Sequence, residues 1–228
     1  MKRALFTLLF LFSACGVADA ALDGRGRLDP ALILPPPPAA NSPLAKAEVA
    51  ELHAIAQRAT PDMLAAARRD DKDERPDLFN GVLAFDLTAL PVTSKLLDDV
   101  VSEEAADAKA AKSYFHRDRP WIVDPSIETC ATHGPGPAKT SYPSGHSTLA
   151  FSMGVVLATL MPEMAQAILA RAKDYAENRL VCGFHFRSDI VAGQELGAIV
   201  AVKLMQDPGF AREMEAARAE LRSQHHAN

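Results

Sequence analysis

Apolar residues recur at three- and four-residue steps along most of the chain from Ala45 onward, a spacing typical of helices that bury one face. Alternating apolar and polar positions, which would indicate half-buried strands, are nearly absent. The sequence therefore predicts an all-α protein, a compact single-domain helical bundle. Prolines and charged residues interrupt the pattern, and the expected breaks lie at Pro61, 68–77, Pro91, 120–143, Pro162 and Pro208.

The first 44 residues differ from the rest in composition. Residues 1–20 combine two basic residues, a short apolar stretch and a final Ala18-Asp19-Ala20, the pattern of a cleaved signal peptide. The following segment includes Pro35 to Pro38, which favour an extended polyproline conformation. We expect a signal peptide at 1–20, a proline-rich N-terminal arm at 21–44 and a helical domain at 45–228.

A signal peptide predicts an exported protein. The alternative is a lipid-attachment box ending at Cys15, which would tether the exported chain through that residue. Later apolar segments are too short or too interrupted by charge to cross a bilayer, so we expect no transmembrane segment in the mature chain. The formal net charge is −5, from 24 basic and 29 acidic residues without a long basic block, which argues against a nucleic-acid polymer as partner.

Removal of the signal peptide leaves two cysteines, Cys130 and Cys182. An even count in an oxidising compartment predicts that they form a disulfide. The alternative is a pair of separate buried thiols.

Charged or titratable groups fall on four helical faces that are otherwise apolar. His146 begins the apolar stripe of the segment after Pro143, and Arg179 ends the stripe of the next one. Lys112 ends a third stripe. His185 and Asp189 lie one turn apart on a fourth, close enough to hydrogen-bond. Because arginine is rarely buried without a partner, these placements predict a half-buried polar site.

A phosphate dianion matches this set of residues. Lys112, Arg119 and Arg179 would neutralise it, and the planar fork of arginine fits pairs of phosphate oxygens. Ser144 and Gly145 form a small turn at a helix N-terminus, where backbone amides bind anions. We therefore expect these five residues to bind phosphate.

The two histidines have different predicted roles. His185, with Asp189 holding its other ring nitrogen, is placed to act as the nucleophile, because no serine or cysteine nucleophile is indicated. His146 remains to protonate the leaving alkoxide and later to activate water. No second ligand pair with zinc spacing is present, and we expect neither a metal nor a cofactor. The charged run 68–77 is interpreted as a solvated loop.

Three motifs in order carry a resemblance to a known family. They are Lys112-x6-Arg119-Pro120, Pro143-Ser144-Gly145-His146, and Arg179-x5-His185 followed by Asp189. Together they resemble the signature of the type 2 phosphatidic acid phosphatase and vanadium haloperoxidase superfamily, most closely its class A bacterial non-specific acid phosphatases. The third motif departs at Asn178, where the family usually has serine.

The resemblance implies an all-helical, metal-independent and vanadate-sensitive phosphatase. It also implies a phosphohistidine on His185, a proton donor at His146, secretion to the periplasm and frequent homo-oligomerisation. The expected substrates are small phosphomonoesters. Because Asn178 replaces the usual serine, we expect the affinity for these substrates to be altered. Two alternatives stay open, a lipid phosphate phosphatase and a non-catalytic exported protein that binds phosphate or phosphoesters. The physiological substrate, the subunit count and the pH optimum stay open as well.

Overall fold

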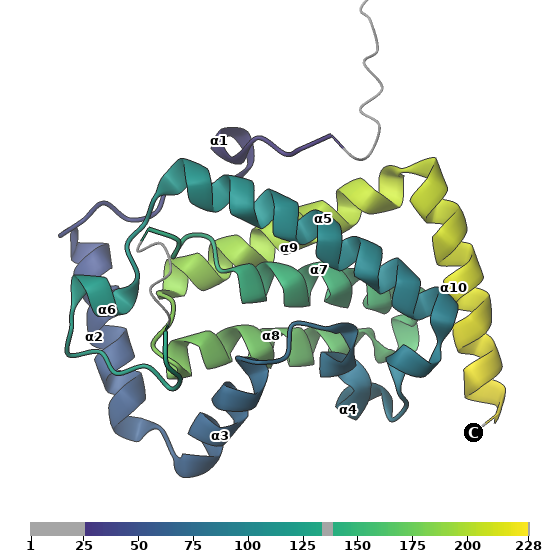
Figure 1. Cartoon of the computed structure of the whole chain (residues 1–228), viewed down its shortest axis with the longest axis horizontal. Coiled ribbons are helices and arrows are strands. Elements are labelled where there is room, and N and C mark those ends of the chain that lie inside the picture. The colour runs from purple at the N-terminus through teal and green to yellow at the C-terminus, as the bar shows by residue number, and fades with distance from the viewer. Residues whose placement is uncertain (1–25, 134–138, 228) are drawn as a thin grey trace, which may run out of the picture.

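The structure, a computed structural model, describes residues 26–133 and 139–227 (Figure 1). Every regular element in these two ranges is a helix, which confirms the predicted all-α fold. The expected signal peptide at 1–20 and the alternative lipid-attachment site at Cys15 lie outside the described residues. Within the described ranges, no helix is both long enough and apolar enough to cross a membrane.

The elements follow one another in a simple order. They are α1 (Pro30–Ile33), α2 (Pro43–Arg58), α3 (Pro61–Asp70), η1 (Pro76–Phe79), α4 (Asn80–Leu83), η2 (Leu87–Ala89), α5 (Pro91–Phe115), α6 (Pro120–Val123), α7 (Gly145–Leu160), η3 (Pro162–Met164), α8 (Ala165–Val181), α9 (Arg187–Gln206) and α10 (Pro208–Ala227). Many of these helices begin with proline, whose fixed φ and missing N–H suit the first helical position. The breaks expected at Pro61, Pro91 and Pro208 are therefore confirmed as helix starts.

Helix α7 lies at the centre of the bundle. It packs against α5, α8 and α9, while α10 crosses one end and α2, α3 and α6 lie near the other (Figure 1). Two glycines of α9 permit the close approach of α7 and α9: a Cβ on Gly193 would lie 2.5 Å from the carbonyl oxygen of Ser144, and one on Gly197 would lie 2.5 Å from that of Thr148. The N-terminus of α7 is thereby held against the first turns of α9.

The arm before α2 passes over this core. Asp29 caps the short helix α1, and the chain then runs extended through the four prolines. The hydroxyl of the buried Tyr142 donates a 2.6 Å hydrogen bond to the carbonyl oxygen of Pro35. The arm is therefore attached to the loop that leads into α7.

Cys130 and Cys182 form a disulfide, as predicted, and the alternative of two separate thiols is wrong. The bond joins the segment after α6 to the C-terminal end of α8, across 52 residues of sequence. Gly183 follows with a φ of +67°, and a Cβ there would lie 2.5 Å from the carbonyl oxygen of Glu128. Only glycine fits this turn, which carries the chain from α8 towards His185.

Candidate active site

Four helix ends bring the predicted site residues together. Lys112 comes from the last turn of α5, Arg179 from the last turn of α8, His146 from the first turn of α7, and Asp189 from the first turn of α9. Arg119 and His185 lie in the segments that precede α6 and α9. Residues up to 77 positions apart in sequence thus form one cluster.

The imidazole of His185 lies at the centre of this cluster and is fully buried. Its Nε2 is 2.8 Å from Nη1 of Arg119, and its Nδ1 is 3.4 Å from Oδ2 of Asp189. Because a guanidinium group has only donors, Nε2 must present its lone pair to Arg119, and Nδ1 must carry the proton that faces Asp189. Burial, with the charges of Arg119 and Arg179, lowers the pKa of His185 well below its usual 6.5. The ring is therefore neutral.

Asp189 is held by a set of donors. Its Oδ2 accepts hydrogen bonds from the hydroxyl of Ser141 at 2.6 Å and from the backbone N–H of Phe186 at 2.8 Å. Its Oδ1 accepts one from Nη1 of Arg117 at 2.6 Å, and Arg117 also pairs with Glu48 at 2.6 Å. Burial raises the pKa of Asp189 to about 6, and the charge of Arg117 opposes this rise. The carboxylate is fixed in position beside His185.

The three predicted phosphate-binding cations are close together and largely buried. Burial and the charge of Arg119 lower the pKa of Lys112 to about 8, and burial lowers that of Arg119 to about 10. Arg119 also donates to the carbonyl oxygen of Phe184 at 2.8 Å. The guanidinium of Arg179 lies 4.7 Å from the ring centre of Phe184, and its Nε is buried with no hydrogen-bond partner among the described residues. That N–H is available to an anion.

The N-terminus of α7 completes the cluster. Ser144 is the N-cap, its hydroxyl accepting from the backbone N–H of Ser147 at 3.3 Å. The backbone N–H of Ser144 donates to the carbonyl oxygen of Asp189 at 2.9 Å. A Cβ on Gly145 would lie 3.0 Å from Nζ of Lys112, so the absence of a side chain lets the ammonium approach this helix end.

His146 stacks on the buried ring of Tyr175, with ring centres 5.6 Å apart and planes 22° apart. Its Nε2 lies 3.3 Å from Oε1 of Glu74 and 3.5 Å from the carbonyl oxygen of Asp71. Burial and the charge of Arg179 lower the pKa of His146 well below 6.5. His146, which begins an apolar stripe in the sequence, therefore points into the bundle.

The charged run 68–77 is not simply the solvated loop that its composition suggested. Asp71 forms a 2.7 Å ion pair with Nη1 of Arg179, and Glu74 contacts His146. Asp70 binds Arg171 through both oxygens and accepts from the amide of Asn178 at 2.7 Å. The side-chain amide of Asn178, where the third motif departs from the family, therefore has an acidic partner on this run.

Sequence reasoning missed Arg117, Ser141, Asp71 and Glu74. A signal existed for Arg117, because it lies two residues before Arg119 in an extended segment, where alternate side chains share a face. The acidic residues gave no such signal, since their contacts depend on the path of the chain after α3.

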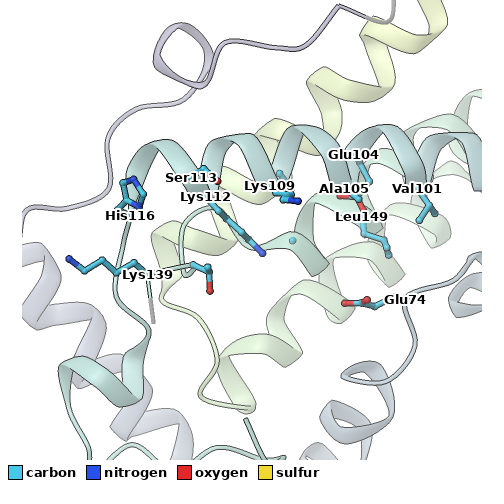
Figure 2. Close-up of a pocket in the computed structure, with 13 residues that line it drawn as sticks. Glu74, Val101, Glu104, Ala105, Lys109, Lys112, Ser113, His116, Lys139 and Leu149 are labelled. Atoms are coloured by element: carbon cyan, nitrogen blue, oxygen red, sulfur yellow. The ribbon is translucent and has the colours of Figure 1, made fainter. Parts of the chain in front are cut away.

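A cleft of about 540 Å³ opens beside the cluster (Figure 2). Lys112, Gly145 and Glu74 line the part that adjoins the cluster, and α5 forms one wall. Figure 2 shows the ammonium of Lys112 and the carboxylate of Glu74 pointing into the same space. His185 and Arg179 do not line this cleft. The guanidinium of Arg179 is instead paired with the carboxylate of Asp71. No group of three or more His, Cys, Asp or Glu side chains suited to a metal ion occurs in the described ranges.

Comparison with known proteins shows clear relatives. Residues 91–212 match the PAP2 superfamily. An acid phosphatase from Zymomonas mobilis is 32% identical over 199 residues, which cover 85% of this chain and 75% of the relative. A non-specific acid phosphatase from Salmonella typhi is 29% identical over 196 residues, 82% of this chain and 78% of the relative.

A solved structure supports the same architecture. The crystal structure of a transmembrane PAP2-type phosphatidylglycerolphosphate phosphatase from Bacillus subtilis matches with a TM-score of 0.56 at 17% identity, over 76% of this chain and 89% of that one. At this identity the likeness shows a shared fold.

Proposed function

The chain belongs to the PAP2 superfamily, among its class A bacterial non-specific acid phosphatases, and we propose that it hydrolyses small phosphomonoesters through a phosphohistidine on His185. The observation that carries this proposal is the state of His185. Its neutral ring has a lone pair on Nε2 beside Arg119 and a proton on Nδ1 directed at Asp189. This arrangement suits a nucleophile with an orienting carboxylate.

In the first step, Arg119, Arg179, Lys112 and the amides at the start of α7 bind the phosphoryl oxygens. Arg119 moves its donor from Nε2 to phosphate, and Nε2 attacks phosphorus as the bond to the ester oxygen breaks. Asp189 stabilises the positive charge that develops on the ring. His146 gives its proton to the leaving oxygen, so the product departs as a neutral alcohol.

In the second step, water attacks the phosphorus of the phosphohistidine. His146, now neutral, takes the proton of the water, and the electron pair of the phosphorus–nitrogen bond returns to Nε2 of His185. Inorganic phosphate then leaves. The bound dianion offsets the neighbouring cations that lower the pKa of His146, and together with Glu74 it favours the protonated form that the first step requires.

Replacement of His185 tests the mechanism. His185→Ala should abolish hydrolysis of p-nitrophenyl phosphate in buffer that contains a chelator, and acid-labile label from a ³²P-phosphomonoester should be trapped on wild type alone. His53→Ala is the matched control, because His53 lies in α2 and pairs with Asp124. Full activity of His185→Ala would refute the proposed nucleophile.

The same preparation tests the remaining parts of the proposal. We expect inhibition by vanadate, activity without added metal, and recovery of the processed chain from the periplasm as a homo-oligomer. Turnover of a phosphorylated lipid in preference to p-nitrophenyl phosphate would favour a lipid phosphate phosphatase. Calorimetric binding of phosphate without turnover of any ester would favour a binding protein.

A further inference from the structure

One buried acid in the cleft has no role in the proposed mechanism. Glu104 lies on α5 and lines the cleft, yet its residue is only 4% exposed. Its Oε2 is buried without a hydrogen-bond partner among the described residues. An unsatisfied buried carboxyl oxygen costs free energy, which a ligand with a hydrogen-bond donor would recover.

The surroundings of Glu104 resemble a binding pocket for an organic group. The neighbouring lining is apolar and comes from Val101, Ala105 and Leu149. Figure 2 shows Val101 and Leu149 at the same end of the cleft as Glu104, with the carboxylate of Glu74 on the opposite side. This end of the cleft therefore combines an apolar wall with two acidic groups.

Within the protein, Lys112 supplies the countercharge for both acids. Its positive charge acts on Glu104, and the charges of Glu104 and Glu74 act in turn on Lys112. Burial raises the pKa of Glu104 to about 8, a rise that Lys112 opposes. A phosphate dianion bound to Lys112 would neutralise this ammonium. Both acids would then face the alcohol part of the substrate without a buried cation to balance them.

A cation on the alcohol would replace this countercharge and lower the pKa of Glu104, which is mostly protonated at pH 7 without such a cation, so that Glu104 ionises when the amine binds. Lys109 and Lys139 also line the cleft, but they are exposed, and solvent screens their repulsion. Glu104 is buried, so its attraction for a cation is screened much less. Glu104 and Lys112 are eight residues apart on one helix, a rise of about 12 Å, which sets the upper length of a molecule that spans both.

We propose that Glu104 and Glu74 select phosphomonoesters whose alcohol carries a primary ammonium group, with the phosphate on Lys112 and the ammonium on one of the two carboxylates, according to its distance from the ester oxygen. This inference rests on the proposed function, because it assigns the substrate class of the same site. Glu74 lies beside His146, so it would meet an ammonium close to the ester oxygen. Glu104 would contact an ammonium group that lies farther from the ester oxygen along the cleft.

Matched substrates test this proposal. Glucosamine 6-phosphate and glucose 6-phosphate differ only in an ammonium against a hydroxyl group, and 2-aminoethyl and 2-hydroxyethyl phosphate form a shorter pair. For wild type at pH 7 we expect kcat/KM to favour the amine of each pair by about fivefold. This is less than the roughly tenfold effect of one buried charge-assisted contact, because the side chain of Glu74 is 62% exposed and Glu104 has to ionise. Glu104→Gln should reduce the ratio for the sugar pair to below about twofold, and Glu74→Gln should do so for the shorter pair.

Glu103→Gln is the control, since Glu103 neighbours Glu104 on α5 but pairs with Lys203 away from the cleft. It should keep the wild-type ratios. The proposal is overturned if wild type shows no preference for the amines, or if both cleft variants retain it. If Glu104→Gln fails to fold, the proposal is still tested by the wild-type kcat/KM ratios and by the ratio of Glu74→Gln for the shorter pair.

Failure of the proposed function gives a different result. In that case neither the sugar pair nor p-nitrophenyl phosphate is hydrolysed. Calorimetric dissociation constants of the two sugar phosphates then replace kcat/KM, and equal constants would overturn the inference.

Discussion

Asp71 forms an ion pair with the guanidinium of Arg179, and we propose that this guanidinium binds phosphate. Removing the negative charge of Asp71 should therefore strengthen phosphate binding. The 2.7 Å ion pair must open before Arg179 can donate fully to a phosphoryl oxygen. Asp71→Asn keeps the size and an acceptor oxygen but removes the negative charge. The variant therefore isolates the electrostatic competition between this carboxylate and the ligand.

The magnitude follows from the burial of the pair. Hydrogen bonds to charged groups contribute about 1.5–3 kcal/mol, and the lower end applies here because the side chain of Asp71 is 18% exposed. Since about 1.4 kcal/mol corresponds to a factor of ten, inorganic phosphate should bind about tenfold more tightly to Asp71→Asn than to wild type. Repulsion between Asp71 and a bound dianion acts in the same direction.

The assay is competitive inhibition of p-nitrophenyl phosphate hydrolysis by inorganic phosphate, with calorimetric titration as a second measurement. Asp98→Asn removes the same charge from an exposed position on α5 and should leave the inhibition constant near the wild-type value. An unchanged or higher inhibition constant for Asp71→Asn would refute the reasoning. Asp71 would then remain on Arg179 while phosphate is bound.

Three further predictions concern the support of the site. Arg117→Gln should lower kcat more than tenfold and move the acid limb of the pH–rate profile to higher pH, because the lost cation lets the pKa of Asp189 rise above about 6. Gly193→Ala should lower the melting temperature by about 3–10 °C, since its Cβ would meet backbone at the start of α7, whereas Gly81→Ala meets nothing within 4 Å and should not. Glu104→Gln should match wild type in stability below pH 4.5 and exceed it increasingly towards pH 8. The reason is that the pKa of Glu104 is about 8 in the folded protein and 4.5 in the unfolded chain, so the free energy of unfolding of wild type falls as the pH rises between these two values. Thermal melts at pH 4 and pH 8 measure the difference between the two proteins.

Helical periodicity was sufficient to predict much of the cluster. Arg179 ends a stripe of buried residues on α8, including Ile168, Ala172 and Tyr175, and is itself buried. A cation at the end of such a stripe has to face an anion or an acidic side chain, whichever helices surround it. The pattern therefore predicted a charged site before the packing was known.

The acidic partners could not be predicted in this way. Asp71 lies 108 residues from Arg179 in sequence, within a run whose high charge is also typical of solvated loops. Nothing in local periodicity distinguishes the carboxylate that turns inward from those that face water. Their assignment requires the position of α3 against α8, which depends on tertiary packing.

The carboxylates explain how several cations can remain buried close together. Arg119 and Arg179 both lower the pKa of Lys112, which means that each cation disfavours the charge of its neighbours. Asp71 on Arg179 and the acids facing Lys112 offset this repulsion. If these cations bind phosphate as we propose, phosphate exchanges with the carboxylates, and its affinity is lower than three unpaired cations would give. In the proposed mechanism, the same exchange would favour release of product phosphate, because the acidic partners would return to the cations as it leaves.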